Sequence, residues 1–189
     1  MSAVGTLAHY PGYARRAPTA AAVALAIGVL AMVAGCGRDA VRSTAQRSAV
    51  VPQRDWSGTS PADPASANAV LIRAISLVGT PYRYGGNTPE GGFDCSGLVN
   101  YVYDDMLEIK LPRTSRELAA YQGPRIAPER LATADLVFFG SGGQVSHVGI
   151  YVGEGRFVHA PSSGGTVRLD HLDGHYWRDH YSGAKRVLR

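Results

Sequence analysis

The chain of 189 residues is long enough for one domain of ordinary size with appended segments. Hydrophobic residues make up 45% of it and charged residues 18%, which lies within the globular range, so we expect a packed core. The formal net charge is +4 and the sequence contains no dense basic run, so nucleic acid is not an expected partner. The mild basic excess fits a protein that acts near an anionic polymer or membrane, and it fits an ordinary exported protein equally well.

The N-terminal segment has the layout of a bacterial export signal. Arg15 and Arg16 precede an almost wholly apolar run over residues 19–33, which is shorter than the roughly 20 apolar residues that a membrane-spanning helix needs. The run ends in Val-Ala-Gly followed by Cys36, which resembles the lipobox of bacterial lipoproteins. This resemblance implies that residues 1–35 are a signal peptide, that Cys36 is acylated and becomes the new N-terminus, and that the lipid holds the protein on a membrane. The alternative is a plain signal or anchor helix that happens to contain a cysteine.

Residues 36–67 carry few large apolar side chains and are rich in Ser, Ala, Arg, Pro, Thr and Gln. Such a composition cannot bury enough surface to order itself, so we expect a flexible tether before a folded domain over residues 68–189. Gly37 stands where an aspartate marks inner-membrane retention in enteric bacteria, which favours the outer membrane, facing the periplasm. A disulfide between Cys36 and Cys95 is possible in an exported protein, although each cysteine has a better explanation alone.

Three helices are predicted in the first half of the folded domain. Asn68 can cap a helix with one apolar face, which Gly79 closes. A second helix is expected to begin at Cys95, because the apolar residues that follow keep helical spacing. Thr114 and Glu117 form a capping box at the start of a third, shorter helix.

Four strands are predicted in the second half. They cover residues 136–139, 145–152, 156–160 and 184–188. The second and third strands are joined by Gly-Glu-Gly over residues 153–155, which indicates a hairpin. Helices that come first and a mostly antiparallel sheet that follows predict an α+β layered domain.

Cys95 is the candidate nucleophile. A thiol attacks as the thiolate, and a helix N-terminus stabilises that anion through its unpaired N–H groups and its dipole. A base must also lie within hydrogen-bond reach of the thiol, and a third group must orient the base. His147 and His159 lie on the two strands of the predicted hairpin, where paired side chains are about 5 Å apart, so His159 can reach His147 and set its tautomer. Each of the three residues alone is more often structural, but together they indicate a catalytic site.

Five segments resemble, in order, the successive motifs of NlpC-type cell-wall peptidases. They are Thr80-Pro-Tyr-Arg-Tyr-Gly-Gly-Asn87, Phe93-Asp-Cys-Ser-Gly-Leu-Val99, Leu111-Pro-Arg-Thr-Ser115, Ser146-His-Val-Gly-Ile-Tyr-Val-Gly153 and Phe157-Val-His-Ala160. The similarity covers the whole folded domain. It implies a papain-like fold, with N-terminal helices packed on the sheet, and a reaction that needs no metal or cofactor.

The resemblance also implies a role for each matching residue. Cys95 would be the nucleophile, His147 the base and His159 the orienting third member, a position that the family fills with His, Asn or Gln. Tyr82 would lie over the thiolate and help a backbone N–H of Cys95 to hold the oxyanion. Three further residues match positions that line the substrate groove, namely Asp94, Ser96 and Ser146.

The implied function is hydrolysis of peptidoglycan stem peptides by a monomeric cysteine endopeptidase. Cleavage is expected at diaminopimelate, either across a D-alanyl cross-link or at the γ-D-glutamyl bond within a stem, and the single catalytic domain on a lipoprotein tether favours the cross-link. One alternative is a papain-like amidase or acyltransferase with another acyl substrate, and another is a catalytically idle wall-binding lipoprotein. A zinc site near His171, His175 and His180 lacks a recognised ligand pattern. Trp177 is expected in the core.

Overall fold

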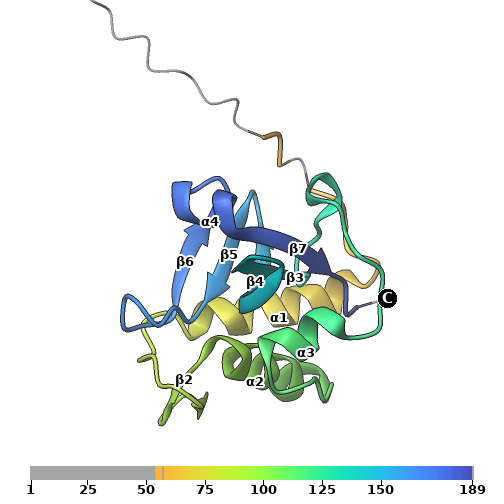
Figure 1. The fold of residues 1–189 in the computed structure, drawn as a ribbon. Helices are drawn as coiled ribbons and strands as arrows, with labels where there is room; N and C mark the ends of the chain where they lie inside the picture. Colours follow the sequence, from red (N-terminus) through yellow and green to blue (C-terminus); the bar gives the residue numbers. More distant parts are fainter. Residues whose placement is uncertain (1–53, 57, 189) are drawn as a thin grey trace, which may run out of the picture. The chain divides into compact units, whose positions relative to one another are not determined.

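The computed structural model describes residues 54–56 and 58–188, in which three helices cover one face of a five-stranded sheet (Figure 1). Within that part of the chain, no helix is both long and apolar enough to span a bilayer. The predicted signal peptide, the lipid-bearing Cys36 and most of the predicted tether lie outside the described residues.

The first helix, α1 (Pro64–Ser76), begins four residues before the predicted cap at Asn68. Asp63 caps it instead, because its carboxylate accepts a hydrogen bond from the Ser66 backbone N–H at 3.1 Å. Pro64 fits the first turn, where a missing N–H has no cost. The folded domain therefore includes the end of the segment that composition assigned to the tether.

The other two predicted helices are confirmed. Helix α2 (Cys95–Leu107) begins at Cys95, and α3 (Ser115–Ala120) has the expected capping box between Thr114 and Glu117. A two-stranded ribbon of β1 (Asn87–Thr88) and β2 (Gly92–Phe93) precedes α2 and was not predicted.

The sheet has the order β6-β5-β4-β3-β7, and all its neighbours are antiparallel. Its strands are β3 (Leu136–Ser141), β4 (Gln144–Gly153), β5 (Arg156–His159), β6 (Arg168–His171) and β7 (Tyr181–Lys185). The hairpin between β4 and β5 is confirmed, whereas the last strand begins three residues earlier than predicted. Strand β6, the short helix α4 (His175–His180) and the 3-10 turn η1 (Pro128–Arg130) were not predicted.

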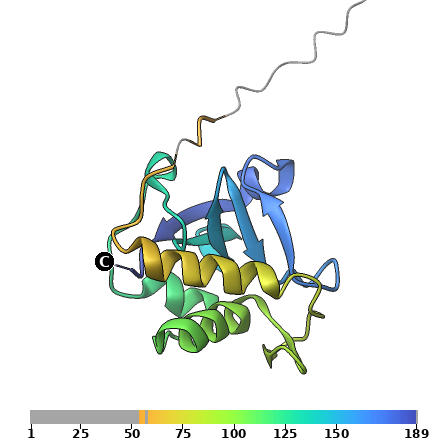
Figure 2. The same ribbon diagram turned by 180° about the vertical axis from the view of Figure 1, so that it is seen from behind.

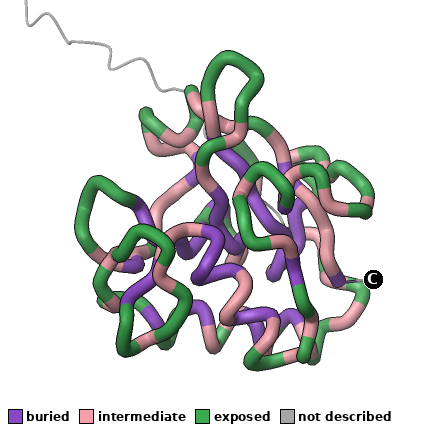
Figure 3. The backbone as a smooth tube through the Cα atoms, turned by 60° about the horizontal axis from the view of Figure 1, so that its bottom comes forward, coloured by how far each residue is buried: buried purple, intermediate pink, exposed green. Residues whose placement is uncertain are grey.

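Alternate side chains of the sheet enter two separate apolar clusters. Val148 and Val158 pack with α1 and α2, which lie against the same face of the sheet in both ribbon views (Figures 1 and 2). Phe139 and Phe157 point to the opposite face, where Trp177 of α4 packs against them. Buried residues occur in the strands, in the helices and at several positions between them, and the exposed stretches lie at the periphery of the molecule (Figure 3).

Trp56 attaches the segment before α1 to this second face. Its indole nitrogen donates to Asp173 at 2.7 Å, and its ring packs against Tyr151 and His171. This part of the predicted tether is therefore in contact with the folded domain.

Candidate active site

Cys95 opens α2 and lies against the middle strand of the sheet. Asp94 caps the helix, with Oδ1 accepting the Gly97 backbone N–H at 2.6 Å. The backbone N–H of Val148 on β4 lies close enough to the Cys95 sulfur to favour its anion. The thiol is therefore held beside the strand residue that directly follows His147.

The Cys95 thiol is protonated in the resting site. Burial raises the pKa of the thiol, and the negative charge of Asp94 raises it further. The backbone N–H groups of Val148, Ser96 and Cys95 favour the anion but do not outweigh the loss of water. The helix N-terminus alone predicts a thiolate, so the structure differs from that expectation because the sulfur is buried.

The two predicted histidines meet, with 2.9 Å between His147 Nε2 and His159 Nδ1. They are not directly opposite each other, because Ile150 pairs with Val158 and this register places His159 beside Gly149. A Cβ at Gly149 would lie 2.6 Å from the Phe157 ring and 3.3 Å from the Cβ of His159. Glycine at this position therefore makes room for a diagonal contact between the two imidazoles.

Asp170 extends the row of polar side chains beyond His159. Its Oδ2 lies 3.0 Å from His159 Nε2, and it also accepts hydrogen bonds from Trp177 Nε1 at 2.8 Å and from Arg168 Nη2 at 2.9 Å. Strand β6 brings it there, because Phe157 pairs with Asp170 and His159 pairs with Arg168 across the β5–β6 ladder. The sequence does not predict a role for this residue, since β6 lacks an apolar alternation and the histidines near Asp170 form no recognised ligand pattern.

The charge of Asp170 determines the tautomers of both imidazoles. Burial alone raises the pKa of Asp170, but the Trp177 hydrogen bond and the neighbouring His159 and Arg168 hold it below its usual range. A carboxylate can only accept hydrogen bonds, so His159 donates from Nε2 and accepts at Nδ1. His147 then donates from Nε2, which leaves its Nδ1 unprotonated and able to take a proton.

Both imidazoles are neutral near pH 7. Burial lowers the pKa of His147 to about 3, and the neighbouring His159 and Arg168 lower it in the same direction. Burial also lowers the pKa of His159 to about 4, against the opposing effect of Asp170. The site therefore combines a neutral thiol with a neutral imidazole, which is the starting state for transfer of a proton from sulfur to nitrogen.

The residues expected around this centre fall into two groups. Tyr82 lies close to Cys95, and burial, together with the charge that Cys95 carries when ionised, raises the pKa of the Tyr82 hydroxyl, which therefore remains a donor. Asp94 and Ser96 are engaged within the protein: Asp94 pairs with Arg113 at 2.8 Å, and Ser96 is only 5% exposed. Their contact with substrate remains a prediction, while their visible task is to hold the start of α2. Arg113 belongs to the motif over residues 111–115, and the sequence alone predicts no role for it.

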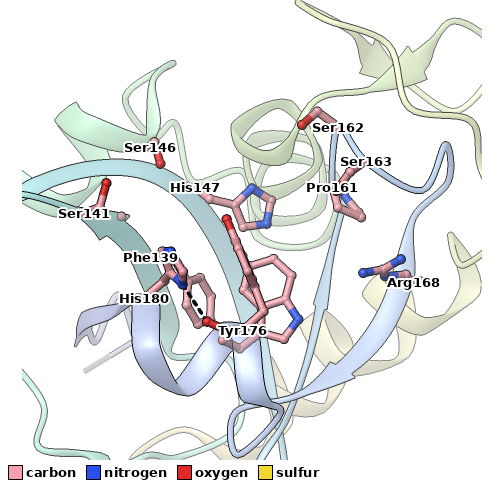
Figure 4. A pocket seen from close by; sticks show the side chains of 12 residues that line it. Phe139, Ser141, Ser146, His147, Pro161, Ser162, Ser163, Arg168, Tyr176 and His180 are labelled. Carbon is pink, nitrogen blue, oxygen red and sulfur yellow. Dashed lines mark hydrogen bonds between the residues drawn. The ribbon is translucent and has the colours of Figure 1, made fainter.

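Ser146 is exposed and lies at the rim of a cavity of about 410 Å³ beside His147 (Figure 4). Trp177 forms part of the wall and stacks on the His147 ring, with 5.3 Å between ring centroids. It is half-buried and was expected only as a core residue. In the part of the chain that the structure describes, no group of three or more His, Cys, Asp or Glu is arranged to hold a metal ion.

Comparisons with known proteins agree with the fold. A model of the NlpC/P60 family matches residues 79–186, more than half of the chain. Murein DD-endopeptidase MepH of Escherichia coli K12 is 45% identical over 128 residues, which are 65% of this chain and 46% of that protein. The bifunctional muramidase/DL-endopeptidase CwlT of Bacillus subtilis 168 is 43% identical over 122 residues, which are 62% of this chain and 36% of that protein.

A solved structure from Staphylococcus aureus Mu50, described as similar to a lipoprotein of the NLP/P60 family, superimposes with a TM-score of 0.59 at 36% identity. The match covers 69% of this chain and 45% of that one. The chain thus spans less than half of the length of these three proteins.

The buried histidines predict a fold that weakens in mild acid. Each imidazole binds a proton near pH 6.5 in the unfolded chain, but only near pH 3 for His147 and pH 4 for His159 in the folded state. Between those values the unfolded chain holds more protons, so stability is complete above about pH 6.5 and is lost as the pH falls toward 4. Thermal unfolding between pH 7.5 and pH 4.5 measures the effect.

His159→Gln should show a smaller loss of Tm over this range than the unaltered protein, because one of the two titrating groups is gone. His175→Gln, which removes an exposed histidine of α4, is the matched control and should follow the unaltered protein. Identical pH dependence in His159→Gln and the unaltered protein would contradict the assignment of buried, neutral imidazoles.

Proposed function

Because the chain belongs to the NlpC/P60 family, we propose that it is a cysteine endopeptidase that hydrolyses peptide bonds of peptidoglycan. One observation carries the proposal: Cys95 at the start of α2 lies beside Val148, the residue that follows His147 on β4, and contacts run from His147 through His159 to Asp170. Such a series supplies a nucleophile, a base of defined tautomer and the groups that orient the base. The names of the relatives MepH and CwlT support a murein substrate.

The reaction follows from the positions of these groups. Cys95 gives its proton to His147 Nδ1 as the sulfur bonds to the amide carbon, and the Cys95 backbone N–H and the Tyr82 hydroxyl stabilise the oxyanion. The C–N bond then breaks, the amine leaves with the proton from His147, and a thioester remains. Water adds to the thioester and gives a proton to His147, after which the C–S bond breaks, the acid leaves and the proton returns to sulfur.

The bond cut is assigned to D-alanyl–diaminopimelate in a cross-link. Two observations support this choice. MepH, at 45% identity, is named a DD-endopeptidase, and the sequence predicts a lipid anchor before the catalytic domain. The γ-D-glutamyl–diaminopimelate bond is the second candidate, and CwlT, at 43% identity, is named a DL-endopeptidase.

The cell envelope is the proposed location, with Cys36 carrying a lipid in the outer membrane. The lipobox-like sequence ending at Cys36 supports the anchor, and so does the similarity to a lipoprotein-like structure. Cys36 lies outside the described residues, so its modification needs a direct chemical test.

Cleavage of defined muropeptides tests the function. The protein should convert a cross-linked dimer into monomers, release less diaminopimelate dipeptide from an uncross-linked tetrapeptide, and leave casein intact, as mass spectrometry can show. Cys95→Ala should stop turnover, because deletion of a comparable nucleophile lowers kcat on the order of 10⁶-fold. The variant must keep the Tm of a folded protein.

Each other outcome would change the assignment. Dipeptide release without dimer cleavage would move the bond to γ-D-glutamyl–diaminopimelate. Muropeptide binding without any cleavage would favour the idle wall-binding alternative. Casein cleavage with both muropeptides untouched would refute a wall hydrolase.

Asp170 is expected to act through His159 as a positioning residue. Asp170→Ala should lower kcat by about 10²-fold, because general-base catalysis loses the correct imidazole tautomer. Asp170→Asn should be milder, since an amide oxygen can still accept the His159 proton. The two residues are then replaced together. If Asp170 acts through His159, adding Asp170→Ala to the His159→Gln variant should lower kcat further by no more than about twofold.

Additive losses in kcat from Asp170→Ala and His159→Gln would show that the two residues act independently. A matching collapse of Tm in Asp170→Ala would show that the carboxylate supports the fold rather than the base. The pH profile of kcat separates these cases, because only a loss of imidazole orientation changes its acid limb.

The anchor at Cys36 gives a separate prediction. The protein expressed in a Gram-negative host should partition into the membrane fraction and incorporate labelled palmitate. Cys36→Ser should remove the label and leave the protein either uncleaved or released in soluble form. Unaltered protein that is soluble in the periplasm and carries no lipid mass would refute the anchor without affecting the catalytic proposal.

A further inference from the structure

We infer that the cavity beside His147 is a subsite for a carboxylate on the amino acid whose amine is released, and that Arg168 is its cation. This inference deepens the proposed function and rests on it. The cavity measures about 410 Å³, and none of the twelve described residues that line it is acidic. Its polar lining consists of hydroxyls and basic groups, which suits an anion.

Arg168 has an unused hydrogen-bonding edge. Its Nε and Nη2 both donate to Asp170 Oδ2, at 3.1 Å and 2.9 Å, which occupies one side of the planar group. Nη1 has no hydrogen-bond partner among the described residues, so the edge formed by the two Nη atoms can still receive two carboxylate oxygens. In Figure 4 the guanidinium and the loop at Pro161–Ser163 lie on one side of His147, with Ser141 and Ser146 on the other.

The other arginine near the centre lacks such an edge. Arg113 donates from Nη1 to Asp94 Oδ1 and Ser96 Oγ, and from Nη2 to Asp94 Oδ2 and the Gly86 carbonyl. Its hydrogen-bonding capacity is used to hold the start of α2. Of these two arginines, only Arg168 can bind a substrate anion without breaking an existing contact.

The position of the cavity identifies the part of the substrate that enters it. The acyl group becomes attached to Cys95, which does not line the cavity, whereas the leaving amine takes its proton from His147, which does. The substituents of that amine therefore extend into the space beyond His147. In a diaminopimelate-containing substrate, the carbon that bears this amine also bears a carboxyl group, which would then face Arg168.

The aromatic wall fits the rest of such a residue. Tyr176 and Trp177 of α4 line the cavity, and Trp177 also holds Asp170 and covers His147. A hydrocarbon chain can pack on these rings while its carboxylate reaches Arg168. Trp177 thus lines the subsite and also contacts His147 and Asp170, so recognition of the leaving group is coupled to the orientation of the base.

Two cross-linked dimers test the inference, identical except that the diaminopimelate carboxyl next to the cleaved amide is free in one and amidated in the other. The unaltered protein should cleave the free acid with a kcat/KM at least about tenfold higher, as expected for one charge-assisted contact. Arg168→Gln should bring this ratio below about threefold, whatever its effect on the overall rate through Asp170. Arg156→Gln is the control: it removes an exposed arginine of β5, at the end of the strand away from His159 and Arg168. This variant should keep the full preference for the free acid.

Arg168→Lys covers the case in which the glutamine variant does not fold, and it should keep a reduced preference because it retains charge without the planar fork. Titration of both dimers onto the Cys95→Ala protein should show the same preference in Kd.

Equal cleavage of the two dimers by the unaltered protein would overturn the subsite and leave the proposed function standing. An undiminished preference in Arg168→Gln would overturn the role of Arg168. Failure of the unaltered protein to cut either dimer would refute the cross-link assignment, and with it this inference, and failure to cut the uncross-linked tetrapeptide as well would refute the proposed function itself.

Discussion

A single carboxylate oxygen organises the candidate site. Asp170 Oδ2 accepts hydrogen bonds from His159, Trp177 and Arg168, at distances between 2.8 Å and 3.1 Å. Because a carboxylate cannot donate, it fixes the proton on His159 and, through that ring, the proton on His147. The same oxygen holds the indole that covers the base and the guanidinium that borders the cavity. The positions of His147, of Trp177 stacked on it and of Arg168 beside the cavity therefore all depend on Asp170 Oδ2.

The sheet makes this convergence possible through its register. His147, His159 and Asp170 come from three adjacent strands, and their side chains leave the same face as Phe139 and Phe157. A shift of one residue in any strand would turn its polar group into the opposite cluster, against the helices. The apolar residues between the polar ones thus hold the register, since Val148 and Val158 are fully buried under α1 and α2.

The parts of this site that the sequence predicts are those with a local signal. Helix α2 starts where Asp94 and the apolar spacing indicate, and the hairpin that carries His147 and His159 is marked by its turn. Asp170 and Arg168 lie on a four-residue strand with no apolar alternation, and His159, which Asp170 orients, lies on the neighbouring strand. Their roles follow from pairing between β5 and β6, which no short window of sequence contains. The early start of α1 was missed for a different reason, because composition hid a local Asp-Pro cap.

The protonation states of the resting site explain how its anion-binding groups can serve catalysis. Burial raises the pKa of the Cys95 thiol and lowers that of His147 to about 3, so the separated charges of a thiolate and an imidazolium are disfavoured before substrate binds. The N–H groups of Val148, Ser96 and Cys95 nevertheless favour the thiolate. Groups that stabilise an anion absent from the ground state lower the barrier rather than the starting energy. As sulfur attacks the amide, negative charge moves to the carbonyl oxygen beside the start of α2, and the imidazolium that forms is balanced through His159 by Asp170. The buried site thus favours charge separation only along the reaction.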